Sequence, residues 1–140
     1  IFNLRNRMLH YFFIEILLLF LSYLIAGLNG LIFIIFHSLI SIILLELVDY
    51  IQHYGLERTK KNGVYEAYGE QHSWNSRYST ANWSTFNLGL HAEHHQTANK
   101  NYPLLSHQKK EMEMPANYSI MIIMALIPPL WFKFMNPRLK

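Results

Sequence analysis

The sequence predicts an all-α integral membrane protein: a helical bundle with a transmembrane hairpin and a cytoplasmic, histidine-rich helical cap. Three observations lead to this prediction. Two long apolar runs stand next to each other near the start of the 140-residue chain. Lysine and arginine are absent from both runs and from the turn between them, and most of the histidines lie downstream.

The first two predicted elements are membrane helices at residues 8–27 and 31–54. Both runs are apolar apart from a few serines and tyrosines and isolated acidic and histidine side chains, and neither has an amphipathic stripe. A helix needs roughly 20 mostly apolar residues to cross a bilayer, and each run reaches that length with its flanks. The Gly-rich turn at 27–30 favours a transmembrane hairpin over two buried helices of a soluble protein.

The basic residues give the predicted hairpin an orientation. Arg5 and Arg7 precede the first run, and the next basic residue is Arg58, after the second run. Because positive residues stay on the cytoplasmic side of a membrane, both ends of the hairpin should be cytoplasmic. We therefore expect an integral membrane protein whose downstream histidines lie on the cytoplasmic side.

The remaining elements are a cap and a final helix. Residues 55–116 are predicted to form the cytoplasmic cap, with a turn at Asn62-Gly63. Residues 117–135 are predicted as an apolar C-terminal helix, which Pro128-Pro129 must break or end. We expect residues 1–140 to be the C-terminal part of one membrane domain, because the chain begins at Ile1 without a leader.

Composition narrows the chemistry. The chain has no cysteine, which excludes disulfides, thiolate metal sites and cysteine-ligated iron–sulfur clusters, so a metal must be held by histidine and carboxylate. A net charge of +3 suits an anionic membrane surface. No basic stripe with interleaved aromatic residues is present, so we expect membrane lipid and no nucleic acid as a partner.

The most informative segment is residues 91–95, His-Ala-Glu-His-His. Residues i, i+3 and i+4 share one face of a helix, so His91, His94 and His95 are expected to point into one small volume. Imidazole binds iron, copper, nickel or zinc, and three imidazoles nearly complete a coordination shell. A polar surface helix would gain nothing from crowding three groups that repel when protonated, so we predict a metal site.

A second cluster stands at the inner end of the second apolar run. Glu46, Asp49 and His53 share a helix face, and charges at the edge of the hydrocarbon region are costly unless they are paired, hydrated or bound to metal. We predict His53 as a ligand and Asp49 or Glu46 as its support. Snorkelling into the headgroups is the alternative for Glu46. For His72 a ligand, a hydrogen-bond donor to a ligand and a helix cap all stay open.

Four segments resemble membrane alkane 1-monooxygenases of the fatty acid desaturase and hydroxylase superfamily. Residues 49–56 (Asp-Tyr-Ile-Gln-His-Tyr-Gly-Leu) are similar to that family's Asn-Tyr-x-Glu-His-Tyr-Gly-Leu signature. Residues 72–76 match its His-Ser-Trp-Asn segment, residues 90–95 its last histidine box, and residues 128–131 its C-terminal end. Order and approximate spacing also agree, so the resemblance covers nearly the whole chain.

The resemblance implies two non-haem iron ions, O2 as co-substrate, terminal hydroxylation of alkanes or similar alkyl chains, a rubredoxin-type electron donor and a bacterial inner membrane. No catalytic residue beyond the metal ligands is implied. The ligands on this chain would be His53, His91, His94 and His95. Residues that could orient them are Glu46, Asp49, His72 and Glu93.

Departures from the family pattern keep other functions open. Asp49 and Gln52 replace the usual Asn and Glu, and residues 89–90 are Gly-Leu instead of Gln-Arg. The family's first two histidine boxes are not in this chain, so by itself it should be inactive. The rivals are a desaturase or a lipid or xylene hydroxylase of the superfamily, and a non-catalytic truncated membrane protein. A zinc hydrolase is disfavoured because His-Glu-x-x-His is missing.

Overall fold

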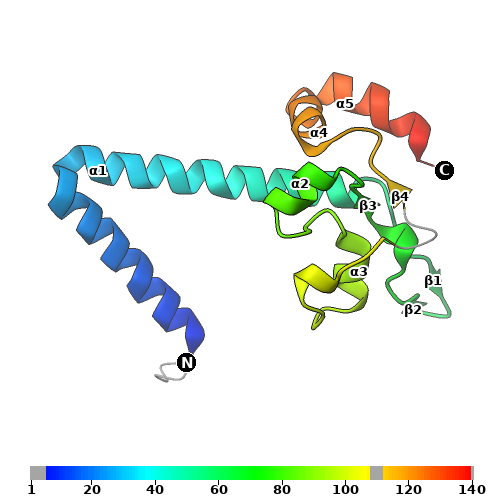
Figure 1. Ribbon diagram of the computed structural model, residues 1–140, viewed down its shortest axis with the longest axis horizontal. Coiled ribbons are helices and arrows are strands. Elements are labelled where there is room, and N and C mark those ends of the chain that lie inside the picture. The colour runs from blue at the N-terminus through cyan, green and yellow to red at the C-terminus, as the bar shows by residue number, and fades with distance from the viewer. Residues whose placement is uncertain (1–5, 108–111, 140) are drawn as a thin grey trace. The chain divides into compact units, whose positions relative to one another are not determined.

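The computed structural model describes residues 6–107 and 112–139, which are mostly helical (Figure 1). Arg5, which was used above to predict the orientation of the hairpin, therefore lies outside the described residues. The chain divides into two compact units, Ile1–Leu45 and Glu46–Lys140. The helical class is confirmed for the described residues, with the addition of two small sheets of two-residue strands.

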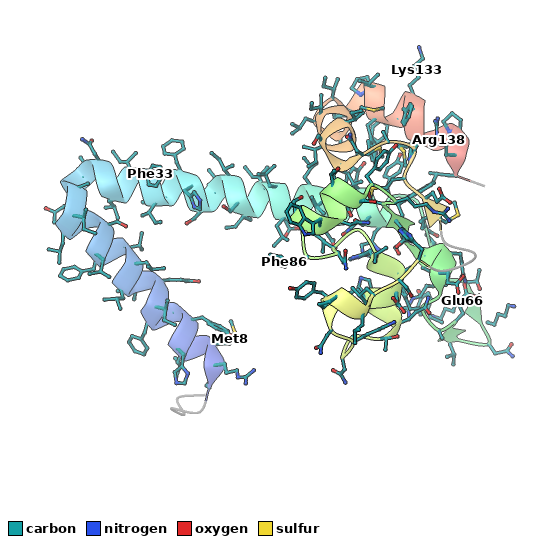
Figure 2. All side chains as sticks on the ribbon, in the orientation of Figure 1. Met8, Phe33, Glu66, Phe86, Lys133 and Arg138 are labelled. Carbon is teal, nitrogen blue, oxygen red and sulfur yellow. The ribbon has the colours of Figure 1, made fainter. Side chains whose placement is uncertain are left out.

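The first unit consists of most of α1 (Arg7–His53), which is kinked at Ala26 and Gly27. Gly27 has φ 58°, a conformation that glycine adopts without the steric cost of a side chain. The break thus reaches Gly27, the first residue of the predicted turn, whereas residues 28–30 are helical. Side chains such as Met8 and Phe33 project into the surroundings from both arms (Figure 2).

Among the described residues, α1 is the helix long and apolar enough to cross a membrane. Its large apolar side chains are exposed on all sides, which suits a helix surrounded by lipid rather than one with a single buried face. The protein is therefore a membrane protein. The bundle, the cytoplasmic cap and the orientation stay predictions.

α1 ends at His53, where the chain turns at Gly55 with φ 68°. The left-handed backbone at Gly55 favours glycine, and an added Cβ there would also displace the side chain of Leu139, whose Cδ1 would lie 2.4 Å away. This sharp ending places His53 in the last turn of the helix, next to the elements of the second unit.

The second unit joins short elements around the end of α1. The antiparallel strands β1 (Lys60–Lys61) and β2 (Val64–Tyr65) are connected through Asn62 and Gly63, which both have positive φ, as a two-residue type I′ hairpin requires. The predicted Asn-Gly turn is thus confirmed. The elements of the unit are β1 (Lys60–Lys61), β2 (Val64–Tyr65), η1 (Glu70–His72), β3 (Trp74–Asn75), α2 (Ser79–Ser84), α3 (His91–Gln96), η2 (Tyr102–Leu104), β4 (Met112–Glu113), α4 (Tyr118–Ala125), α5 (Pro128–Met135) and η3 (Asn136–Arg138).

The segment predicted as one apolar helix over 117–135 forms two helices, α4 and α5. Pro128 disfavours helical backbone in the preceding residue, and Ile127 is non-helical (φ −120°, ψ 85°). Pro128 itself opens α5, where its missing N–H leaves no helical bond unmade. The core of this unit, which packs the end of α1 against β3, α4 and α5, consists of Ile51, Trp74, Met114, Tyr118, Met121, Trp131 and Met135.

Candidate metal centre

Three histidines converge at the junction of α1 and α3. The Nε2 atom of His91 lies 3.0 Å from Nε2 of His53 and 2.8 Å from Nε2 of His95. One ligand atom from each ring falls within 4.8 Å of the other two. We call His53, His91 and His95 the three-histidine cluster. His91 opens α3 and His95 follows one turn later, so both reach the ring at the end of α1.

The distances within the three-histidine cluster suit coordination of a metal ion better than hydrogen bonds among the three rings. Two nitrogens each about 2.1 Å from a metal and at right angles lie about 3 Å apart, which is the separation found here. An imidazole nitrogen has a single in-plane lone pair, so His91 Nε2 cannot accept well from two rings at once. Its Nδ1 atom is buried without a hydrogen-bond partner among the described residues. The surrounding protein therefore satisfies this ring poorly.

Electrostatics keep His91 and His95 in the form that binds metal. Burial lowers the pKa of His91 to about 3, and the neighbouring rings of His95, His53 and His94 add to the effect. The pKa of His95 is also lowered, first by burial and then by His53 and His94. Because a metal needs the neutral imidazole, both rings are ready to coordinate at neutral pH.

His94 does not join the cluster. Its ring is exposed, with its centroid 6.2 Å from that of His91 and 5.8 Å from that of His95. Consecutive helical residues are rotated by about 100°, so His94 and His95 cannot face the same point. The structure thus brings two of the three predicted helix histidines into one volume, together with His53.

The predicted carboxylates take different positions. Asp49 Oδ1 lies 3.6 Å from His53 Nε2, one turn back on α1, whereas Glu46 is exposed. Glu93 turns away from the histidines: its carboxylate accepts hydrogen bonds from Lys100 and from the Ser106 backbone. Burial raises the pKa of Glu93, but these bonds outweigh it and the pKa is lowered. Asp49 is therefore the predicted carboxylate that stands beside the cluster.

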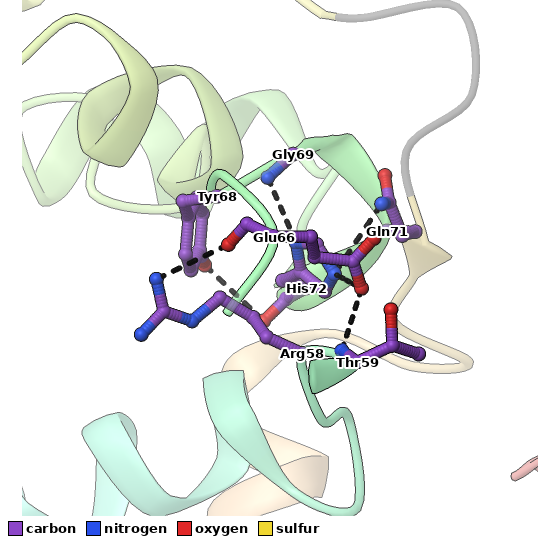
Figure 3. Close-up of polar contacts among 7 residues, drawn as sticks. All are labelled: Arg58, Thr59, Glu66, Tyr68, Gly69, Gln71 and His72. Carbon is purple, nitrogen blue, oxygen red and sulfur yellow. Dashed lines mark hydrogen bonds and ion pairs between the residues drawn. The ribbon is translucent and has the colours of Figure 1, made fainter. Parts of the chain in front are cut away.

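His72 has protein partners on both ring nitrogens (Figure 3). Its Nδ1 accepts from the Gly69 N–H at 2.8 Å, which places the proton of the neutral ring on Nε2, 3.2 Å from Glu66 Oε1. His72 is only 3% exposed. Hydrogen bonds lower the pKa of Glu66, first from the Thr59 backbone and then from His72. In this structure His72 links η1 to the β1–β2 hairpin.

Several residues that support the site were missed by sequence reasoning. Tyr68 packs between the three-histidine cluster and His72. The centroid of its ring lies 4.7 Å from that of His95 and 5.5 Å from that of His72. Buried Gln52 donates to Leu88 O at 3.1 Å and to Tyr118 Oη at 2.6 Å. These partners are 36 and 66 residues away, so local periodicity holds no signal for them.

The departures from the family signature have structural roles here. The side-chain amide of Gln52 donates two hydrogen bonds, which an ionised glutamate could not do. At Gly89 an added Cβ would lie 2.0 Å from Asn82 Oδ1 and 2.8 Å from Ser76 Cβ. A glutamine would not fit there without moving both neighbours.

Comparison with known proteins agrees with the motifs. The sequence model of the fatty acid desaturase family matches residues 2–124. Alkane 1-monooxygenase 2 of Alcanivorax borkumensis is 36% identical over 139 residues, covering 99% of this chain and 36% of that protein. Alkane 1-monooxygenase 2 of Pseudomonas aeruginosa is 38% identical over 137 residues (97% and 36%), and its alkane 1-monooxygenase 1 is 34% identical over 141 residues (100% and 37%). The chain thus spans little more than a third of the length of these curated relatives.

Proposed function

This chain belongs to the fatty acid desaturase family, and from that premise we propose that it is part of a membrane monooxygenase that hydroxylates alkanes at the chain terminus with O2. The observation that carries the proposal is the convergence of three imidazole Nε2 atoms from His53, His91 and His95. Its relatives that are named alkane 1-monooxygenases make an alkane or similar alkyl chain the substrate class that fits best.

The proposed metal is non-haem iron, two ions in the whole protein, which would activate O2 to break an unactivated C–H bond. On this chain His53, His91 and His95 would hold one ion. His94 is exposed and turned away from the cluster, so we assign it to the second. Asp49 Oδ1 lies 3.6 Å from the same Nε2 atom of His53 that would bind the ion, so its carboxylate would stand beside the ion rather than on the other nitrogen of the ring.

The finer features of the proposal follow from the family and from the positions of the basic residues. The centre would face the cytoplasm at a bacterial inner membrane and receive electrons from a rubredoxin-type donor. α1 would lie in the lipid, where alkanes concentrate. An alkane could then move along this helix from the bilayer to the histidines at its end. By itself this chain should be inactive, because it supplies only part of the ligands.

The test uses the whole protein in membranes, with reduced rubredoxin, O2 and either a linear alkane or acyl lipids as substrate. We expect a 1-alkanol as the product and two bound irons. Oxidation of the acyl lipids instead of the alkane would favour a desaturase or lipid hydroxylase. Absence of bound iron would favour a non-catalytic protein.

A variant of the outward-facing ligand tests the assignment of the irons. His94→Ala should abolish hydroxylation and reduce bound iron from two ions to one, because the three-histidine cluster stays intact. Full activity and full iron content in this variant would reject His94 as a ligand.

A further inference from the structure

Two adjacent residues of β3 contact both elements that carry the three-histidine cluster. Successive side chains of a strand point to opposite faces, so Trp74 and Asn75 extend in different directions from one short strand. Trp74 reaches the end of α1, and Asn75 reaches the beginning of α3. Both are almost completely buried, at 3% and 0% exposure.

On the α1 side, Trp74 donates its indole N–H to the backbone oxygen of Tyr54 at 2.9 Å. Tyr54 directly follows His53, at the point where the helix ends and its last carbonyl groups need donors from outside the helix. The bond therefore fixes the backbone next to one ligand.

On the α3 side, Asn75 Oδ1 accepts the backbone N–H of Ala92 at 2.9 Å. The N-cap of α3, Leu90, has no side chain that could accept this bond, so Asn75 supplies the cap from 17 residues upstream. Its Nδ2 atom donates to Ser73 O and Met112 O, at 3.1 and 3.4 Å. Both polar atoms of this side chain thus have partners, and Oδ1 holds the residue that follows His91.

The strand itself is fixed as well. Trp74 and Asn75 pair with β4 in parallel, and Met114 donates its N–H to Asn75 O at 2.8 Å. Trp74 packs in the core with Ile51 and Met121. A rigid dipeptide that bonds beside His53 at one end and beside His91 at the other can set the separation of the two helices.

We propose that Trp74 and Asn75 are positioning residues that set the distance between His53 and His91 and so shape the metal centre. The inference rests on the proposed metal function and deepens it. Neither side chain needs to touch the metal, because each acts through the backbone next to a ligand. Residues that orient ligands typically change metal affinity by about 10- to 100-fold when they are replaced.

The test is a titration of the metal-stripped whole protein with Co²⁺, whose visible absorption reports the number and geometry of its ligands. Trp74→Phe removes the indole donor and keeps an aromatic ring, and Asn75→Ala removes the cap. We expect each to weaken Co²⁺ binding roughly 10- to 100-fold and to change the absorption bands.

Two matched controls separate positioning from general loss of stability. Trp131→Phe makes the same change in a buried tryptophan outside β3. Asn82→Ala removes another buried amide, one that bonds to Ser76 O rather than to α3. Both controls should unfold at lower temperature yet bind Co²⁺ with unchanged bands.

Folded Trp74→Phe and Asn75→Ala variants with unchanged Co²⁺ affinity and bands would overturn the inference. If the alanine variant does not fold, Trp74→Phe decides by the same criterion. Cobalt binding does not require turnover, so a protein that binds Co²⁺ through these histidines but does not hydroxylate alkanes would reject the proposed function and leave this inference standing.

Discussion

His91 and His72 are both buried histidines of the second unit, but their environments are opposite. His72 has a backbone donor on one ring nitrogen and the Glu66 carboxylate at the other. His91 has two further imidazoles at one nitrogen and no partner at the other among the described residues. Protein groups provide hydrogen-bond partners for both nitrogens of His72. The nitrogens of His91 are not satisfied in this way by the described residues, and their arrangement suits a bound metal ion.

The comparison shows that burial alone does not identify a metal ligand. A buried polar group is normally hydrogen-bonded, and a ring that meets this rule holds the fold together. A ring that faces others of its kind at about 3 Å, with its pKa lowered to about 3, has the properties of a ligand instead. Each prediction below tests whether this distinction is real.

The largest expected effect is the loss of metal from a variant of the three-histidine cluster. His91→Gln should bind iron at least about 100-fold more weakly, because the central ligand is replaced by a poor one of similar size. His72→Gln is the matched control and should keep its iron. Equal iron contents in the two variants, measured on the purified whole protein, would remove the distinction between the two histidines.

The next effect is on the pH dependence of stability without metal. The His91 pKa is 6.5 in the unfolded chain and about 3 in the folded one, so the unfolded state takes up the proton first. Stability is full above about pH 6.5 and falls as the pH decreases toward 3, by up to about 3 kcal/mol at pH 4. Denaturant titrations across this range measure it, and His91→Leu should flatten the slope. An equal slope in that variant would contradict the lowered pKa.

A smaller effect is expected from the other ring. In His72→Gln the side-chain amide can satisfy Gly69 or Glu66 but not both in the same geometry, which should cost about 1–3 kcal/mol of unfolding free energy. The measurement is chemical denaturation of the metal-loaded protein. Loss of metal before unfolding would show that His72 acts at the centre and not in the fold.

The smallest effect should follow Glu66→Gln. The new side chain can still accept from Thr59 and His72, so only the charge is lost at a partly exposed position. The unfolding temperature should fall less than in His72→Gln and should depend less on salt. A larger change than in His72→Gln would mean that the carboxylate, and not the imidazole, holds the hairpin.

Local patterns in the sequence were enough to predict the long apolar helix, the Asn62-Gly63 turn and the pairing of His91 with His95 on one helix. Each of these features depends on residues that are close together in the sequence. The contribution of His53 was also predicted, from its position at the end of the apolar run. The roles of Asn75, Gln52 and Glu66 could not be predicted. Their bonds join segments that only the folded second unit brings together, and the sequence has no period at those separations.

The same limit applies to the directions in which Glu93 and His94 point. Glu93 lies between ligands in the sequence, but its carboxylate is directed toward Lys100 and Ser106 of the following loop. The spacing of three residues puts His94 on roughly the same helix face as His91, but the rotation between neighbouring residues separates it from His95. Spacing along a helix predicts which residues are close, and only the partners show where each one points.

The six-residue length of α3 has a consequence for how related sequences can diverge. Substitutions between His91 and His95 leave the rotation of the helix unchanged, whereas the insertion or deletion of one residue there would turn His95 by about 100° away from His91. The loop after α3 has contacts of its own, at Lys100, Tyr102 and Ser106, but they do not set the rotation of a ligand. Length changes among homologues should therefore accumulate between residues 97 and 106 and be absent between residues 91 and 95.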